Sequence, residues 1–398
     1  MGDHDRLCTA NRVPDRKAKP VKRLLSRWIA RLARRPALTP AQLRDLAPRR
    51  VLLVRQHNQM GDMICATPCF RALRETFPDA QIALVTAPVN REVVLHNPHL
   101  DRIFTFEQRM WRRPARLWGL LAEMRAFRPD VAFVLASVSF SVTSAALALL
   151  SGARYVVGAD SRPFGHDVSA AAFSLEMPSR PELDTHAVRH SLAPLRGIGI
   201  TTRDLSTVVA IAPEEEETAR RILDDLGLRP GYWALHPGAG KGQNIWPAER
   251  FAALVRRAEA AGHAVLILHG PADAQALAGV LAHLPDPLPP TVKVAPRASI
   301  GVGAALLRLA DRFLCNDTGV MHLAGALPVP TLALFGPTDP ELWKPPSDAV
   351  VALRSPRQTP DGRGPEYGWM ENIGEEDVWR AWRGLRVAGA TGERATEE

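Results

Sequence analysis

Two short segments place a carboxylate where an expected strand passes into a helix. Asp62 ends the run Met60-Gly61-Asp62, which follows the strand expected at Val51–Arg55, and a carboxylate in that position can act as a general base. It also suits a helix N-cap, because its oxygens accept hydrogen bonds from free backbone N–H groups. The run Asn316-Asp317-Thr318-Gly319 follows a later strand, and the N–H groups at the positive end of its helix suit a pyrophosphate.

A glycine-rich segment, His236 to Pro247, lies between a strand and a helix expected to start near Ala248. Its bare N–H groups and the ammonium of Lys241 are suited to hold a diphosphate. It is not a Walker A motif, because Gly242 stands where Ser or Thr must follow the lysine. The sequence also lacks the GxGxxG turn of nicotinamide dehydrogenases. An ordinary flexible connection is the alternative interpretation.

Two further features adjoin these segments. His322 lies one helical turn beyond Gly319, within reach of a phosphate or sugar bound there, although a lone histidine in such a place more often has a structural role. The turn from Phe335 to Pro340 follows the next strand and is placed to close the nucleotide side of the site.

The elements that must position these residues form two alternating series. Strands are expected at Val51–Arg55, Gln81–Thr86, Arg102–Phe106, Val131–Leu135 and Tyr155–Gly158, and again at Trp233–His236, Ala264–His269, Thr291–Val294, Arg312–Cys315 and Thr331–Phe335. A helix is expected over Met63–Phe77, and a polar, proline-bearing region near Pro178–Thr207 interrupts the rhythm. The pattern predicts an α/β protein with two doubly wound, Rossmann-like domains facing a central cleft.

The length of 398 residues and the hydrophobic content of 46% agree with two domains. We expect domains at 49–205 and 206–385, with a polar tail at 386–398. The net charge of +8 resides in residues 1–50, where 14 Lys and Arg oppose 4 Asp and Glu, which gives +10 there and −2 elsewhere. The enzyme body therefore has no basic bias, and we expect no nucleic-acid partner.

Residues 1–48 form a basic extension in which Val21, Leu24, Leu25, Trp28, Ile29 and Leu32 recur at helical spacing. Such a helix, at 20–35, is suited to the surface of the inner membrane, or to docking on the protein itself. Val131–Leu150 has no charged residue, but its central serines favour a strand, a loop and a helix near Val142–Leu150 over a membrane span. We expect a cytoplasmic protein, peripheral on the cytoplasmic face of that membrane.

Four cysteines, Cys8, Cys65, Cys69 and Cys315, form no disulfide framework, which suits a reducing cytosol. Cys65 and Cys69 are expected one helical turn apart. Without a nearby histidine or acidic cluster they suit a protein core better than a metal site.

Taken in order, the motifs resemble glycosyltransferase family 9, the heptosyltransferases of lipopolysaccharide core assembly. The matching pieces are Met60-Gly61-Asp62, His236 to Phe251, Asn316 to Leu327 and Phe335 to Pro340, spread over roughly residues 50–345. The resemblance implies a GT-B fold and an inverting transfer without an essential metal or other cofactor. It also implies a nucleotide-activated heptose such as ADP-heptose as donor, bound by the domain at 206–385, with the domain at 49–205 on the acceptor side.

The same resemblance assigns roles to individual residues. It implies that Asp62 is the general base, and that the following residues contact or line the donor site: Gly238, Ala239, Asp317, Thr318, Gly319 and His322. Asp273 is a weaker match for an acidic contact to the ribose. The family usually has a Lys two residues before its Trp-Pro pair, where this chain has Asn244. Either Lys241 neutralises the diphosphate instead, or the site lacks that charge.

The acceptor side has one candidate, a basic run of Arg109, Arg112, Arg113 and Arg116 that is suited to the phosphates or carboxylates of an anionic glycolipid. A solvated helix face explains the run equally well. The leading interpretation is a transferase that acts on a lipopolysaccharide core or related membrane-linked acceptor. Alternatives are transfer of heptose to a protein or another glycan, a catalytically silent GT-B binding protein and, more distantly, a nucleotide-sugar epimerase.

Overall fold

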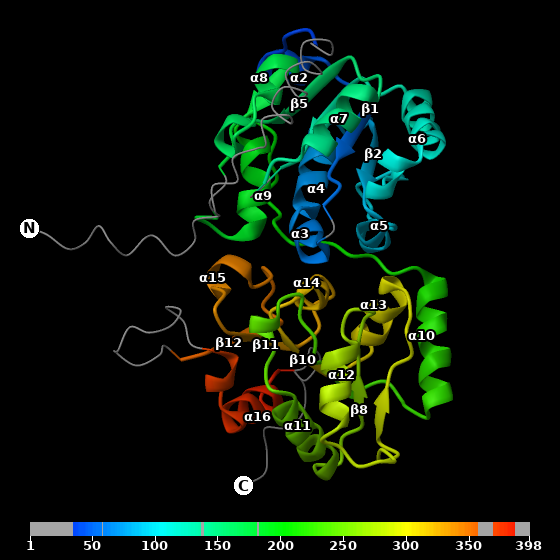
Figure 1. Ribbon diagram of the computed structural model, residues 1–398, viewed down its shortest axis with the longest axis vertical. Coiled ribbons are helices and arrows are strands. Elements are labelled where there is room, and N and C mark those ends of the chain that lie inside the picture. The colour runs from blue at the N-terminus through cyan, green and yellow to red at the C-terminus, as the bar shows by residue number, and fades with distance from the viewer. Residues whose placement is uncertain (1–34, 58, 137–138, 181–182, 357–368, 387–398) are drawn as a thin grey trace, which may run out of the picture. The chain divides into compact units, whose positions relative to one another are not determined.

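The structure, a computed structural model, describes residues 35–57, 59–136, 139–180, 183–356 and 369–386 (Figure 1). The amphipathic helix expected at 20–35 and the tail at 386–398 lie almost wholly outside these ranges. Contacts divide the chain into two compact units. The first unit comprises Met1–Asn58, Ala66–Arg91 and Pro98–Leu205, and the second comprises Gln59–Cys65, Glu92–Asn97 and Ser206–Glu398.

The first unit has a parallel six-stranded sheet in the order β3-β2-β1-β4-β5-β6. Its central strands are buried on both faces, as parallel strands covered by helices must be. The strands are β1 (Arg50–Val54), β2 (Gln81–Thr86), β3 (Arg102–Thr105), β4 (Val131–Val134), β5 (Tyr155–Ala159) and β6 (Leu175–Met177). The five strands predicted for this half of the chain are confirmed, and β6 was not predicted.

The helices of this unit follow their strands closely in the chain. They are α2 (Pro40–Asp45), α4 (Thr67–Thr76), η1 (Gln108–Arg112), α6 (Pro114–Phe127), α7 (Val142–Leu150), η2 (Arg162–Phe164), α8 (Val168–Ala172) and α9 (Ala187–Arg196), while α5 (Pro88–Val94) crosses the division between the units. The strand, loop and helix predicted within Val131–Leu150 are confirmed as β4 and α7. Among the described residues, no helix has the length and apolar character needed to cross a membrane.

Two predictions are wrong: the continuous helix over Met63–Phe77, and the spacing of Cys65 and Cys69 by one turn of it. The helix predicted at Met63–Phe77 begins earlier and is broken, since α3 (Met60–Cys65) ends before Ala66 and α4 starts at Thr67, directly before Pro68. A proline in a helix interior removes a backbone hydrogen bond, whereas one in the first turn does not, so Pro68 favours a new helix that starts just before it. Cys65 and Cys69 therefore lie in different helices. The region Pro178–Thr207 contains α9, a helix whose interior holds Pro194.

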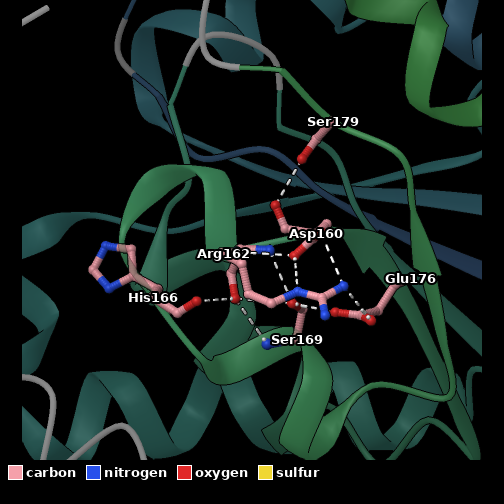
Figure 2. Close-up of polar contacts among 7 residues, drawn as sticks. Asp160, Arg162, His166, Ser169, Glu176 and Ser179 are labelled. Atoms are coloured by element: carbon pink, nitrogen blue, oxygen red, sulfur yellow. Dashed lines mark hydrogen bonds and ion pairs between the residues drawn. The ribbon is translucent and has the colours of Figure 1, made fainter.

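Beyond β5, a polar network joins the loop after this strand to the edge strand β6 (Figure 2). The guanidinium of Arg162 donates to both oxygens of Asp160 and to Glu176, at 2.9–3.2 Å. Ser169 donates to the other oxygen of Glu176 at 2.7 Å. The hydroxyl of Ser179 donates to the backbone carbonyl of Asp160 at 2.6 Å. These contacts fasten a strand of only three residues, which the alternating hydrophobic pattern did not reveal.

The second unit has a parallel six-stranded sheet in the order β12-β11-β10-β7-β8-β9. Its strands are β7 (Trp233–His236), β8 (Val265–Ile267), β9 (Val292–Val294), β10 (Arg312–Asn316), β11 (Thr331–Phe335) and β12 (Val350–Arg354), so five predicted strands are confirmed and β12 is new. Its helices are α3, α10 (Pro213–Leu226), η3 (Gly242–Asn244), α11 (Ala248–Ala260), α12 (Ala274–Leu281), α13 (Ile300–Arg308), α14 (Gly319–Ala326), α15 (Pro340–Trp343), η4 (Met370–Asn372) and α16 (Glu375–Arg383).

Candidate functional site

The candidate site residues of the second unit gather at the carboxyl ends of adjacent strands. The sheet order places β11, β10, β7 and β8 side by side, and the loops that follow them carry Thr338, Asp317, Asn244 and Asp273 respectively. The direction in which the chain adds strands reverses between β7 and β10. Strands β8 and β9 extend the sheet on one side of β7, whereas β10, β11 and β12 extend it on the other side. Such a switch point is where open α/β sheets form a ligand crevice.

Asn316, the last residue of β10, ties the two sides of this switch point together. Its fully buried amide donates to the carbonyls of Pro237 at 2.8 Å and Gly238 at 3.3 Å. Its side-chain oxygen accepts the backbone N–H of Trp246 at 3.2 Å. One amide thus holds both ends of the glycine-rich loop after β7, because a buried amide that lost these partners would be left unsatisfied at considerable cost.

Asp317 is held by neutral donors. Asn244 Nδ2 donates to Asp317 Oδ2 at 3.0 Å, and the Thr338 hydroxyl donates to the same oxygen at 2.5 Å. Burial raises the pKa of Asp317 above its ordinary value, although the Thr338 hydrogen bond and the charge of Lys241 act against this shift. The carboxylate is therefore fixed in orientation without a direct ion pair among the described residues.

Asn244 stands where the family pattern has a lysine, and its side chain contacts Asp317 directly. The residue is 4% exposed. Within the described part of the chain, its amide oxygen Oδ1 is buried without a hydrogen-bond partner. Lys241 begins the same turn and is exposed, and its carbonyl accepts the N–H of Asn244 at 3.0 Å. The position where the resemblance implies a lysine is thus neutral here, and Lys241, the cation of this loop, is exposed to solvent.

Asp273, predicted to meet a ribose, makes internal contacts in this structure. Its Oδ2 lies 3.0 Å from His236 Nε2 and accepts the N–H of Gly270 at 2.6 Å. Burial acts to raise the pKa of Asp273, but the His236 hydrogen bond and the Gly270 N–H outweigh it, so this pKa lies below its ordinary value. Its Oδ1 lies 1.9 Å from the place of a Cβ atom on Gly238. The carboxylate therefore fills the space that this glycine leaves, and its contact with a ribose stays a prediction.

Asp62 lies in α3, which packs against α14 within the second unit. A Cβ atom on Gly61 would lie 2.8 Å from His322 Cδ2, and one on Gly319 would lie 3.4 Å from the backbone nitrogen of Gly61. The two glycines thus permit a close approach of the helices. This contact brings the helix of Asp62 to the start of α14, where Thr318 is the N-cap residue. Asp62 itself is the third residue of α3, so the N-cap interpretation is wrong.

His322 is buried and faces α3. Its Nδ1 lies 3.4 Å from the sulfur of Cys65, one turn beyond Asp62. Its role as a donor contact stays a prediction, as do those of Thr318, Gly319 and Ala239. The four arginines of the predicted acceptor side belong to the first unit, with Arg109 and Arg112 on η1, Arg113 just after it and Arg116 between Pro114 and Phe127 on α6.

Three members of the cluster were missed as site residues: His236, Asn316 and Thr338. Each lies within a motif that the sequence already singled out, His236 at the start of the glycine-rich segment and Thr338 in the turn from Phe335 to Pro340. Their position at or near the carboxyl ends of adjacent parallel strands is the signal that was available. Which strands are adjacent becomes apparent only from the sheet order.

Solved structures define the class to which this fold belongs. The chain is similar to a glycosyl transferase family 9 protein from Veillonella parvula DSM 2008, with a TM-score of 0.71 and 22% identity over 87% of this chain and 97% of that one. It is also similar to the Escherichia coli ADP-heptose LPS heptosyltransferase II, with a TM-score of 0.69 and 20% identity over 84% and 97% of the two chains. The fold is therefore GT-B, with two Rossmann-like domains.

The sequence itself specifies the family. Residues 130–364 match the family model described as glycosyltransferase family 9 (heptosyltransferase). Lipopolysaccharide heptosyltransferase 3 of Escherichia coli is 23% identical over 292 residues, which cover 73% of this chain and 85% of that protein. The chain belongs to glycosyltransferase family 9.

Proposed function

We propose that this chain is an inverting, metal-independent glycosyltransferase that moves a heptose from a nucleotide-activated donor such as ADP-heptose to a lipopolysaccharide core or related membrane-linked acceptor. Family membership and the lipopolysaccharide heptosyltransferases among its relatives support the sugar and the acceptor class. The observation that carries the proposal is the packing of α3, which bears Asp62, against α14, which follows the Asp317-Thr318 turn. A base and a diphosphate-binding helix end are thus parts of one cluster.

In this mechanism Asp62 accepts the proton of an acceptor hydroxyl as that oxygen bonds to the anomeric carbon of the donor sugar. The bond from that carbon to the diphosphate breaks, and the electron pair leaves with the nucleotide diphosphate. The free N–H groups at the start of α14 and the ammonium of Lys241 stabilise the departing charge. Asp317, fixed by Asn244 and Thr338, binds the donor beside them.

The proposal includes the cytoplasmic face of the inner membrane as the place of reaction, with residues 20–35 in contact with its surface. The proposal is tested first by calorimetric binding of ADP-heptose. Transfer is then measured to two kinds of shortened lipopolysaccharide, one without any heptose and one that carries only part of its heptoses. Binding and turnover are expected. Binding without turnover on any such acceptor would favour transfer to a protein or another glycan. Absence of donor binding would favour the alternative of a catalytically silent GT-B binding protein. The neutral side chain of Asn244 beside Asp317 is compatible with that alternative.

Asp317→Asn is expected to lower the affinity for the donor without lowering the thermal stability of the protein at neutral pH. The folded-state pKa of Asp317 lies above the unfolded value of about 3.9, so its contribution to stability is full below that pH and is lost as the pH rises through the folded pKa. The amide oxygen of the variant still accepts from Asn244 and Thr338, so thermal stability at neutral pH is not expected to fall. Donor affinity is expected to fall about tenfold or more, because a hydrogen bond to a charged group is lost.

Thermal unfolding across the acid range and donor calorimetry measure the two effects. Asp348→Asn, at an exposed aspartate elsewhere in the second unit, is the matched control. If the variant binds the donor as tightly as the parent protein does, the prediction that Asp317 contacts the donor is wrong.

A further inference from the structure

The first unit exposes an unusual combination of side chains on η1 and the first half of α6, two elements that contact each other. Trp118 is 60% exposed and Trp111 is 42% exposed, and the exposed residues around them include Arg112, Arg113 and Arg116. We call this surface, from Gln108 to Gly119, the Trp–Arg face. Indole rings are large apolar groups with one polar N–H, and such rings are rarely left in water without a partner.

The Trp–Arg face is anchored to the core from behind. Leu120, Leu121, Met124 and Phe127 of α6 are buried in the hydrophobic core of the first unit. The ring of Trp111 packs edge-on against Phe106, with their centroids 6.0 Å apart. The two indoles are therefore presented on a rigid support, which lowers the entropy lost when they are buried by a partner.

The charge of the face is almost entirely positive. From Glu107 to Gly119 there are four arginines and one acid, and that acid is paired with Arg109. The Arg109 hydrogen bond lowers the pKa of Glu107, and the charges of Arg116 and Arg113 act in the same direction. Arg112, Arg113 and Arg116 have no ion pair among the described residues. Their charges are therefore available to anionic groups of another molecule.

We propose that the Trp–Arg face binds the headgroup layer of an anionic lipid bilayer, with Trp111 and Trp118 at the boundary of the acyl chains and the arginines on lipid phosphates. Tryptophan prefers this boundary, and arginine forms forked hydrogen bonds with phosphate. The Trp–Arg face is formed by a different stretch of sequence from the basic segment at 20–35. The inference does not depend on the proposed transfer reaction.

A fluorophore on the face itself tests the inference in the full chain. Gly119→Cys suits an environment-sensitive label, because no atom lies within 4 Å of its Cβ position and Cys65, Cys69 and Cys315 are buried. Cys8→Ser removes the remaining thiol. With vesicles of phosphatidylcholine and phosphatidylglycerol, the emission is expected to shift to the blue and to be quenched by nitroxide-labelled lipid. The same label at Asp225→Cys, exposed on α10 of the second unit, is expected to show neither change.

Substitutions then assign the contact to these side chains. Joint replacement of Arg112, Arg113 and Arg116 by Gln is expected to weaken the response about a hundredfold in lipid concentration, since each arginine contributes roughly fivefold near an anionic surface. Trp118→Ser is expected to reduce quenching by lipid, whereas Trp369→Ser, at a tryptophan 44% exposed in the second unit, is not. Unchanged thermal unfolding establishes that the variants are folded.

Three results would overturn the proposal. One is co-sedimentation with vesicles while the label at position 119 stays unshifted, which would assign binding to the basic segment at 20–35. Another is a response that the arginine and tryptophan substitutions leave unchanged. The third is a response only when the vesicles contain lipopolysaccharide, which would assign the face to the acceptor glycan rather than to the bilayer.

Discussion

Asp62→Asn is expected to lower the rate of heptose transfer by a factor of about a hundred or more, while donor affinity stays close to that of the parent protein. The amide retains the shape of the carboxylate but cannot accept the proton of the acceptor hydroxyl, and general-base catalysis contributes about 10²–10⁴-fold. Asp62 lies within α3 and not at its N-cap, so the substitution does not remove a cap that the helix needs. Single-turnover transfer and donor calorimetry, measured on the same preparation, separate the two quantities.

Asp79→Asn is the matched control, because Asp79 is an exposed aspartate of the first unit with no predicted role. Full transfer activity in Asp62→Asn would show that Asp62 is not the general base. Loss of donor binding together with transfer would instead indicate that Asp62 supports the start of α14.

Gly238→Ala is expected to damage the donor loop severely. The added Cβ atom would lie 1.9 Å from Oδ1 and 2.4 Å from Cγ of Asp273, far inside contact distance, so the carboxylate must leave. Its hydrogen bonds to His236 and to the N–H of Gly270 would break with it. Overpacking of this kind costs about 1–3 kcal/mol of unfolding free energy, and donor affinity is expected to fall as well.

Gly240→Ala, two residues along the same loop, provides the control. Its Cβ position has no atom within 4 Å, and the residue is exposed. Thermal unfolding and donor calorimetry should therefore distinguish the two alanines clearly. Equal behaviour of both variants would mean that the contact between Gly238 and Asp273 does not shape the loop.

The sequence predicted most of the fold, because buried parallel strands are short apolar runs bounded by turn residues. The ten predicted strands are present, with ends that differ by at most two residues. The strands that were missed, β6 and β12, lie at sheet edges, where burial on both faces is not required and the apolar run is weaker. Pro68 was visible in the sequence, but whether it breaks a helix or begins a new one depends on where the preceding turn ends.

The site was predicted less completely. Asp317, Asn244 and Lys241 are brought together as the motifs indicated, since their loops follow neighbouring strands. The internal role of Asp273 was not predictable, because it depends on the space left by Gly238, a residue 35 positions away in the chain. The same holds for Gly61, whose role is set by His322 and not by a local turn. Local patterns do not contain such pairings between distant segments.

The amide of Asn316 has a consequence for protein engineering. Because it holds the carbonyls of Pro237 and Gly238 and the N–H of Trp246, the loop after β7 cannot be exchanged as an independent cassette. A chimera that imports this loop from another transferase must import the end of β10 with it. In this unit, two stretches of sequence that lie far apart in the chain therefore form one structural module.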